Sequence, residues 1–140
     1  MSIEAQKTVV RRLHTEANDQ VRYDLLPELV AEDLVYHGPL PLPAPGREGL
    51  RQLLAFFRAA FPAQHTAIHA LTAEGDLVTS LHTHHVTHGG PFMGLPPTGK
   101  EIAVPGIEVF RIADGKIAEM WQQDDLFGLL LQLGMIAPPA

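Results

Sequence analysis

A histidine-rich stretch in the second half of the chain holds the residues best suited to chemistry. His82, His84 and His88 fall at alternate positions, so in a strand they share one face, whereas His85 takes the other face. Neighbouring imidazoles can donate hydrogen bonds to a carbonyl oxygen, and they can equally sit at a subunit interface without a chemical role. His88 also precedes a glycine-rich turn, where shaping the loop is the simpler role.

The pair formed by His82 and His84 also raises the question of a metal ion. Side-by-side imidazoles are found in some metal-binding strands, and His37 or Glu108 could supply a third ligand. Metal-bound imidazoles usually need further groups that orient them, and the sequence identifies none. We therefore expect no metal ion.

Glu108 is the first carboxylate of interest, because it interrupts an apolar row. A buried acidic group is costly unless it pairs with a neighbouring His or Arg or has a function. The residues that share its strand parity are Ile102, Val104, Gly106, Phe110 and Ile112.

Asp125 is the second carboxylate, just beyond the last expected strand. If the extended chain continues, Asp125 lies on the same face as Trp121, and Asp124 faces outward. An apolar pocket would raise the pKa of such a carboxyl group, the more so if Glu108 shared the cavity, and make it a better base. Alternatively, Asp125 is only the N-cap of the last helix. The residues expected on its face are Ile117, Glu119, Trp121 and Gln123.

Hydrophobic periodicity predicts the elements that position these residues. Helices followed by an antiparallel meander indicate an α+β fold, with helices packed on one face of a curved sheet and a pocket at the mouth of the resulting cone. The last helix is apolar all round and is expected to be buried. The expected helices are 3–17, 23–30, 47–61 and 126–134, and the expected strands are 33–37, 66–73, 77–88, 100–112 and 116–123.

Length and composition restrict the class of protein. The 140 residues suit one domain, and a net charge of −6 argues against binding nucleic acid or anionic membranes. The chain has no cysteine, which excludes thiolate catalysis and disulfides. The opening segment lacks the apolar run of a signal peptide, so we expect a soluble cytoplasmic protein.

Several segments match the pattern of a known family. They are 92–100 (FMGLPPTGK), 106–112 (GIEVFRI), 114–121 (DGKIAEMW) and 125–134, together with 36–39 (YHGP) and 46–50 (GREGL). In these segments the chain resembles the SnoaL-like polyketide cyclase (ester cyclase) family, whose members have the NTF2-like, cone-shaped α+β fold. The resemblance covers nearly the whole chain, and it implies a single SnoaL-like domain over residues 1–140.

The resemblance also implies a reaction and a base. Characterised relatives close a ring by an intramolecular aldol step on a polyketide ester, without metal or organic cofactor. Asp125 stands four residues after Trp121 and three before Gly128, where the family places its base. Many relatives have Arg-Trp where this chain has Leu81-His82, a difference that bears on the substrate.

The expected catalytic pair is therefore Asp125 and His84, in a pocket that takes a hydrophobic carbonyl compound. Phe92 and Met93, in the Gly/Pro-rich loop, are included among the pocket residues as a hydrophobic lid or a dimer contact, although core packing is the role favoured for them. The remaining pocket residues are expected to be His37, His82, Glu108 and Trp121.

The sequence also leaves other functions open for the pocket, and it predicts an oligomer. A hydrolase or isomerase could use the same pocket, and a non-catalytic ligand-binding or dimerisation module is a different class altogether. We expect at least a homodimer, as in relatives that pair sheet to sheet, because the open sheet face would otherwise expose a large apolar patch. The residues expected on that face are Val86, Ala103, Ile107 and Val109.

Overall fold

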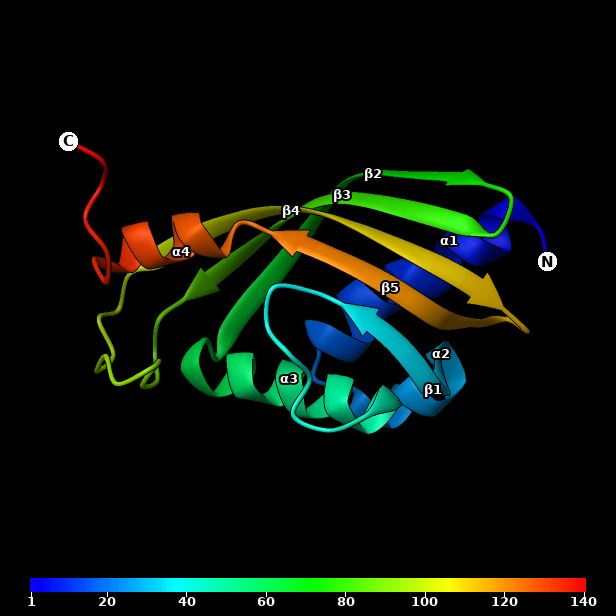
Figure 1. Ribbon diagram of the computed structural model, residues 1–140, viewed down its shortest axis with the longest axis horizontal. Helices are drawn as coiled ribbons and strands as arrows, with labels where there is room; N and C mark the ends of the chain where they lie inside the picture. Colours follow the sequence, from blue (N-terminus) through cyan, green and yellow to red (C-terminus); the bar gives the residue numbers. More distant parts are fainter.

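Five strands form one curved sheet in the order β1-β5-β4-β3-β2, as a computed structural model of residues 1–140 shows (Figure 1). Strands β2 to β5 are antiparallel neighbours, and β1 pairs in parallel with β5 at the edge of the sheet. The strands are β1 (Val30–His37), β2 (Ala63–Glu74), β3 (Leu77–Thr87), β4 (Glu101–Ala113) and β5 (Lys116–Asp124).

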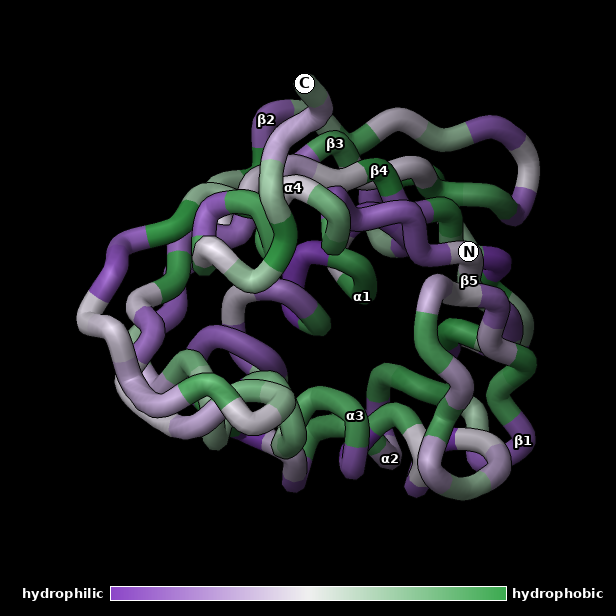
Figure 2. Tube along the Cα trace, turned by 60° about the vertical axis from the view of Figure 1, so that its left-hand side comes forward, coloured by the Kyte–Doolittle hydropathy of each residue, from purple (hydrophilic) through white to green (hydrophobic).

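Helices fill the concave side of this sheet. Figure 2 shows the strands curving around α1, with α3 on the side opposite to β2, β3 and β4. α1 begins after the N-cap Ser2 and continues into a π-helical turn, and α4 packs against β4 at the other end of the sheet. The helices are α1 (Ile3–Arg12), the π-helical turn (Leu13–Asn18), a 3-10 turn (Tyr23–Leu25), α2 (Leu26–Leu29), α3 (Gly46–Ala60) and α4 (Leu126–Leu133).

The core has two parts. The larger cluster lies between α1, α2 and the sheet and contains Val10, Leu29 and Phe110. The smaller one lies below α4 and the Gly/Pro-rich loop and contains Phe61 and Leu129. The α+β class and the expected elements are confirmed.

Two differences from the expected elements concern the edges of the fold. β1 begins three residues earlier than expected and runs parallel to its neighbour. The expectation of a fully buried last helix is wrong, because the helix rests on the sheet by one side and 59% of Phe127 is exposed. None of the helices combines the length and hydropathy needed to cross a membrane.

Candidate active site

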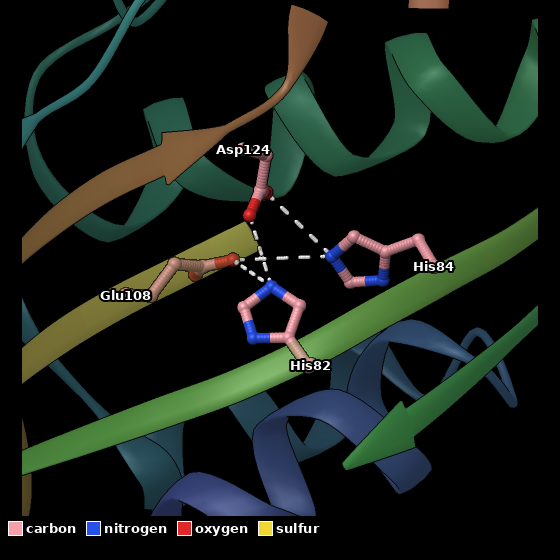
Figure 3. Close-up of side chains that lie close together, drawn as sticks. All are labelled: His82, His84, Glu108 and Asp124. Carbon is pink, nitrogen blue, oxygen red and sulfur yellow. Dashed lines mark hydrogen bonds and ion pairs between the residues drawn. The ribbon is translucent and has the colours of Figure 1, made fainter. Parts of the chain in front are cut away.

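Three adjacent strands bring four ionisable side chains together on the concave face of the sheet (Figure 3). His82 and His84 come from β3, Glu108 from β4 and Asp124 from the end of β5. We call these four residues the inner cluster. Within it, His82 and Asp124 are both register partners of Gly106 on the central strand, so the three residues form one row across the sheet.

Gly106 makes this row possible. A Cβ atom at position 106 would lie 1.7 Å from Asp124 Oδ1 and 2.9 Å from His82 Nε2. The two flanking side chains therefore meet over the glycine, in the space that any larger residue would fill.

The distances within the inner cluster are unequal. His82 Nε2 lies 2.9 Å from both Asp124 Oδ1 and Glu108 Oε2, and its N–H donates to Asp124. His84 Nε2 is farther away, at 3.6 Å from Asp124 Oδ2 and 3.8 Å from Glu108 Oε2. His84 is also the most exposed member, at 14% of its side chain against 5% or less for the others. It is therefore the imidazole that a bound molecule can reach.

A second hydrogen-bonded layer fixes His82. Its Nδ1 lies 2.8 Å from Ser80 Oγ, which in turn lies 3.1 Å from Nε2 of His14 on the π-helical turn. His14 is almost completely buried, and this burial lowers its pKa to about 4. His14 is therefore a core residue, although its place in a polar stretch of the first helix is also typical of a solvated surface residue.

The second layer also fixes the orientation of the His84 ring. Thr66 Oγ1 lies 2.8 Å from both Asp19 Oδ1 and His84 Nδ1. A carboxylate only accepts hydrogen bonds, so the single hydroxyl proton of Thr66 goes to Asp19. Thr66 then accepts from the Nδ1–H of His84, and the other ring nitrogen of His84 faces the carboxylates.

Asp124 is held from its own strand. Gln122 Nε2 donates to Asp124 Oδ2 over 2.7 Å, and Gln122 Oε1 accepts a short hydrogen bond from the Tyr36 hydroxyl. Burial and the nearby carboxylates of Glu108 and Asp124 raise the pKa of Tyr36, so this hydroxyl keeps its proton. These contacts leave Asp124 little freedom to rotate.

The charges of the inner cluster set the protonation of its members. Burial alone would lower the pKa of both imidazoles, but the carboxylates of Asp124 and Glu108 outweigh it and raise the pKa of His82 to about 9 and that of His84 to about 10. Burial would raise the pKa of Asp124, yet His82 and His84 hold it well below its usual range. At neutral pH the inner cluster therefore presents an ionised Asp124 beside a protonated His84.

An apolar pocket opens beside this ion pair. Its cavity volume is about 80 Å³, its mouth is open to solvent, and Asp124, His84 and Gln122 lie in its wall. A second pocket, which reaches Glu108, His14 and the larger core cluster, adjoins it and shares His84 and Gln122. The apolar lining of the first pocket is Leu54, Phe57, Phe61, Val86, Val104, Leu126 and Leu129.

The family model of SnoaL-like polyketide cyclases matches residues 8–133. The chain belongs to the SnoaL-like polyketide cyclase family. Sequence comparison with curated proteins finds no match.

Solved structures of similar proteins show the same fold as this SnoaL-like chain. IdmH of Streptomyces antibioticus, a candidate polyketide cyclase, is 31% identical with a TM-score of 0.82, over 92% of this chain and 98% of IdmH. A candidate polyketide cyclase of Acidithiobacillus ferrooxidans is 28% identical with a TM-score of 0.84, over 98% of this chain and 100% of that protein. TsrD of Streptomyces laurentii is 25% identical with a TM-score of 0.85, over 97% of this chain and 99% of TsrD.

The structure brings three of the sequence-predicted site residues together. His82, His84 and Glu108 all belong to the inner cluster, and His84 also lines both pockets. The fourth member is Asp124, which the parity argument had placed outward.

The expected position of Asp125 in the pocket is wrong. Asp125 is exposed, and its carboxylate accepts a 2.9 Å hydrogen bond from the Gly128 backbone N–H as the N-cap of α4. This is the alternative that its position before the last helix had left open. The buried carboxylate is its neighbour Asp124.

His37 and Trp121 are also away from the pocket, which corrects their expected place. Their rings stack with centroids 5.2 Å apart, and His37 Nε2 pairs with Glu119 Oε2 at 2.7 Å on the opposite face of the sheet edge. His37 lines only a shallow outer surface formed with the proline-rich loop.

Phe92 and Met93 do not form the expected lid. Phe92 is buried in the smaller core cluster, with its ring centroid 5.3 Å from that of Phe61. Met93 has a positive φ of 47° at the tip of the loop and is 66% exposed. Core packing, which was one of the alternatives for this pair, is the role of Phe92.

Replacing the capping residue Asp125 by Ala should destabilise the protein without loss of activity. The lost N-cap hydrogen bond is expected to lower the free energy of unfolding by about 1 kcal/mol. Asp125→Asn is the control, since Asn caps about as well as Asp. Urea unfolding measures the first effect, and turnover of any accepted substrate measures the second. If Asp125→Ala instead had unchanged stability and no turnover, Asp125 would have to be assigned to the active site.

Proposed function

We propose that the protein is an enzyme that closes a ring within a hydrophobic carbonyl compound by an aldol step, with no cofactor. The observation that supports this most is that an ionised carboxylate and a protonated imidazole, Asp124 and His84, lie in the wall of one apolar pocket. An aldol step needs a proton acceptor near a carbon and a proton donor near a carbonyl oxygen, and these two groups have those properties.

Asp124 accepts the proton in the first step. It takes the proton from a carbon next to a carbonyl, while His84 Nε2–H donates a hydrogen bond to the oxygen of the forming enolate. Negative charge on that oxygen weakens the hold of His84 on Asp124, so the basicity of Asp124 rises as the charge develops. Asp124 is therefore a weak base in the resting protein and a stronger base in the transition state of proton removal.

The enolate carbon then forms a bond to a second carbonyl carbon of the same molecule. The electron pair of that carbonyl moves to its oxygen, and the proton held by Asp124 returns to it. The product is therefore an isomer of the substrate. Glu108 and His82 hold Asp124 and His84 in position without touching the substrate.

The pocket favours a hydrophobic substrate. Its walls are mainly aliphatic and aromatic, with Phe57 and Phe61 on one side and Leu129 on the other. The amides of Gln64 and Asn18 lie at the same pocket and could orient further oxygens of the substrate. A compound with several carbonyl groups on an otherwise apolar carbon chain suits this distribution.

Ring closure of a linear ester with alternating ketone groups tests the proposal. The protein should accelerate formation of a cyclic product of unchanged mass. Leu54→Trp, which adds bulk to the pocket wall while Asp124 and His84 are kept, should abolish the acceleration. Addition of 18 mass units would indicate hydrolysis in the same pocket. Tight binding with no chemical change would indicate a non-catalytic binding module.

We also propose that two copies associate through the outer face of the sheet. Leu81 and Ile107 are register partners there and are 44% and 52% exposed, and Leu77 adds a third exposed apolar side chain. The expectation that Val86 lies on this surface is wrong, because Val86 is buried on the other face of the sheet.

Sedimentation at micromolar concentration should therefore give the mass of a dimer, and Ile107→Lys should shift it to the 15.3 kDa monomer. A wild-type protein that sediments at 15.3 kDa under these conditions would contradict the dimer.

A further inference from the structure

Four potential metal-ligand atoms of the inner cluster converge on one point (Figure 3). One atom each of His82, His84, Glu108 and Asp124 lies within 4.8 Å of all the others. The four separations between an imidazole nitrogen and a carboxylate oxygen run from 2.9 to 3.8 Å. Ligand atoms at about 2.1 Å from one metal ion lie roughly 3.0–3.5 Å apart, so the cluster already has nearly the dimensions of a coordination shell.

The cluster also has fewer hydrogen bonds than its ligand atoms could make. His82 Nε2 carries a single proton, which it donates to Asp124, although Glu108 Oε2 lies equally close. His84 Nε2 lies 3.8 Å from Glu108 Oε2, beyond hydrogen-bond distance. Glu108 is 4% exposed and directed into the cluster, and the donors nearest to it are the same two imidazoles that face Asp124, with His82 Nε2 at 2.9 Å and His84 Nε2 at 3.8 Å. Two buried carboxylates thus share the same two imidazole nitrogens, and a cation between the four residues would bind all of these atoms at once.

Supporting groups orient the ligands, which removes the reason for expecting no metal. Ser80 and Thr66 bind the Nδ1 atoms of His82 and His84, so both Nε2 atoms face the centre of the cluster. Gln122 holds Asp124 in the same way. Hydrogen bonds of this kind to the non-ligating atoms are typical of metal sites.

We propose that His82, His84, Glu108 and Asp124 together bind a divalent transition-metal ion such as Zn²⁺. Two imidazole nitrogens and two carboxylate oxygens form a donor set that suits zinc and its neighbours better than Mg²⁺ or Ca²⁺. At neutral pH the imidazoles release their Nε2 protons to solvent when they bind the ion, and the two carboxylates then balance the charge of the dication inside the protein.

Binding of the ion has a consequence for activity, which rests on the function proposed above. Asp124 and His84 become ligands, so neither can exchange a proton with a substrate. Zn²⁺ should therefore inhibit ring closure, and a chelator should restore it. The ion then acts as a reversible block on the same residues that carry the reaction.

The test is titration of the chelator-treated full-length protein with Co²⁺ and Zn²⁺ in the absence of substrate. Co²⁺ should bind one to one and give visible absorption bands of a low-coordinate site, and Zn²⁺ should displace it. Glu108→Gln and His84→Gln should each weaken binding beyond the ~10–100-fold typical of losing a supporting group. Thr66→Val, which removes the hydroxyl that lies between Asp19 and His84 Nδ1 but no ligand, should weaken it by about that amount.

His85→Ala is the matched control, because His85 is an exposed histidine on the other face of the same strand. Its binding should equal that of the wild type. Absence of stoichiometric Co²⁺ binding by the folded wild-type protein, or equal affinity in the Glu108 and His84 variants, would overturn the proposal. An enzyme that is inactive after chelation and active with Zn²⁺ would instead overturn the metal-free reaction and leave the metal site standing.

Discussion

Asp124→Asn is expected to lower turnover by about 10²–10⁴-fold, the usual contribution of a positioned acid or base. Asn fills nearly the same space but does not accept the substrate proton. It also removes a negative charge beside two buried imidazoles, and loss of one partner of a buried ion pair costs about 3–5 kcal/mol of stability. Turnover should therefore be measured well below the melting temperature, with circular dichroism to show that the variant is folded.

Asp125→Asn provides the control on the adjacent residue. Its side chain lies outside the pocket and its capping hydrogen bond survives the change, so turnover should equal that of the wild type. An active Asp124 variant beside an inactive Asp125 variant would reverse the assignment of the base.

Gly106→Ala is expected to have the second large effect, although it adds only one methyl group. The new Cβ would overlap Asp124 Oδ1 at 1.7 Å, so the Asp124 and His82 side chains must separate. Displacement of reacting groups by about 1 Å can reduce a rate by about 10²-fold, and we expect a loss of at least this size. Overpacking of this kind also destabilises a protein by about 1–3 kcal/mol.

Ala103→Val, on the same strand but on the opposite and exposed face, is the control for added volume. Kinetics and thermal melting of both variants check the prediction. If Gly106→Ala has the turnover of the wild type, the reaction does not depend on the close contact of the Asp124 and His82 side chains over residue 106.

Local patterns were sufficient to predict most elements of the fold. α3 lies within one residue of the periodic segment at 47–61, since its apolar residues repeat at helical spacing and Pro62 ends it. The Asp114-Gly115 turn joins β4 to β5 as expected. The parallel pairing of β1 with β5 joins residues more than eighty positions apart, and no local pattern encodes it.

The inward face of β4 was predicted correctly and that of β5 was not. Glu108 lies in a strictly alternating buried row. In β5, the register shifts between the pairs Ile112–Ile117 and Arg111–Glu119. This irregularity changes which alternate positions of β5 face inward. Ile117 faces inward before it, and Met120 and Asp124, whose numbers have the other parity, face inward after it. A parity count that starts from Ile117 therefore selects the wrong carboxylate.

One missed residue did leave a signal in the sequence. His14 follows Val10 by four positions and precedes Ala17 by three, so it lies on the apolar stripe of the first helix. A histidine on such a stripe needs a buried hydrogen-bond partner, which is Ser80. Ser80 itself is a long-range neighbour that only the folded structure identifies.

Deuterium exchange at the carbon next to a carbonyl tests the central claim most directly, because it reports proton removal without requiring the natural substrate. A hydrophobic ketone ester is incubated in D₂O with the wild-type protein, Asp124→Asn or Asp125→Asn, and exchange is followed by NMR. The wild type and Asp125→Asn should both exchange the proton faster than buffer alone, and Asp124→Asn should exchange it at the buffer rate. Equal acceleration by all three proteins would contradict the assignment of Asp124 as the residue that removes the proton.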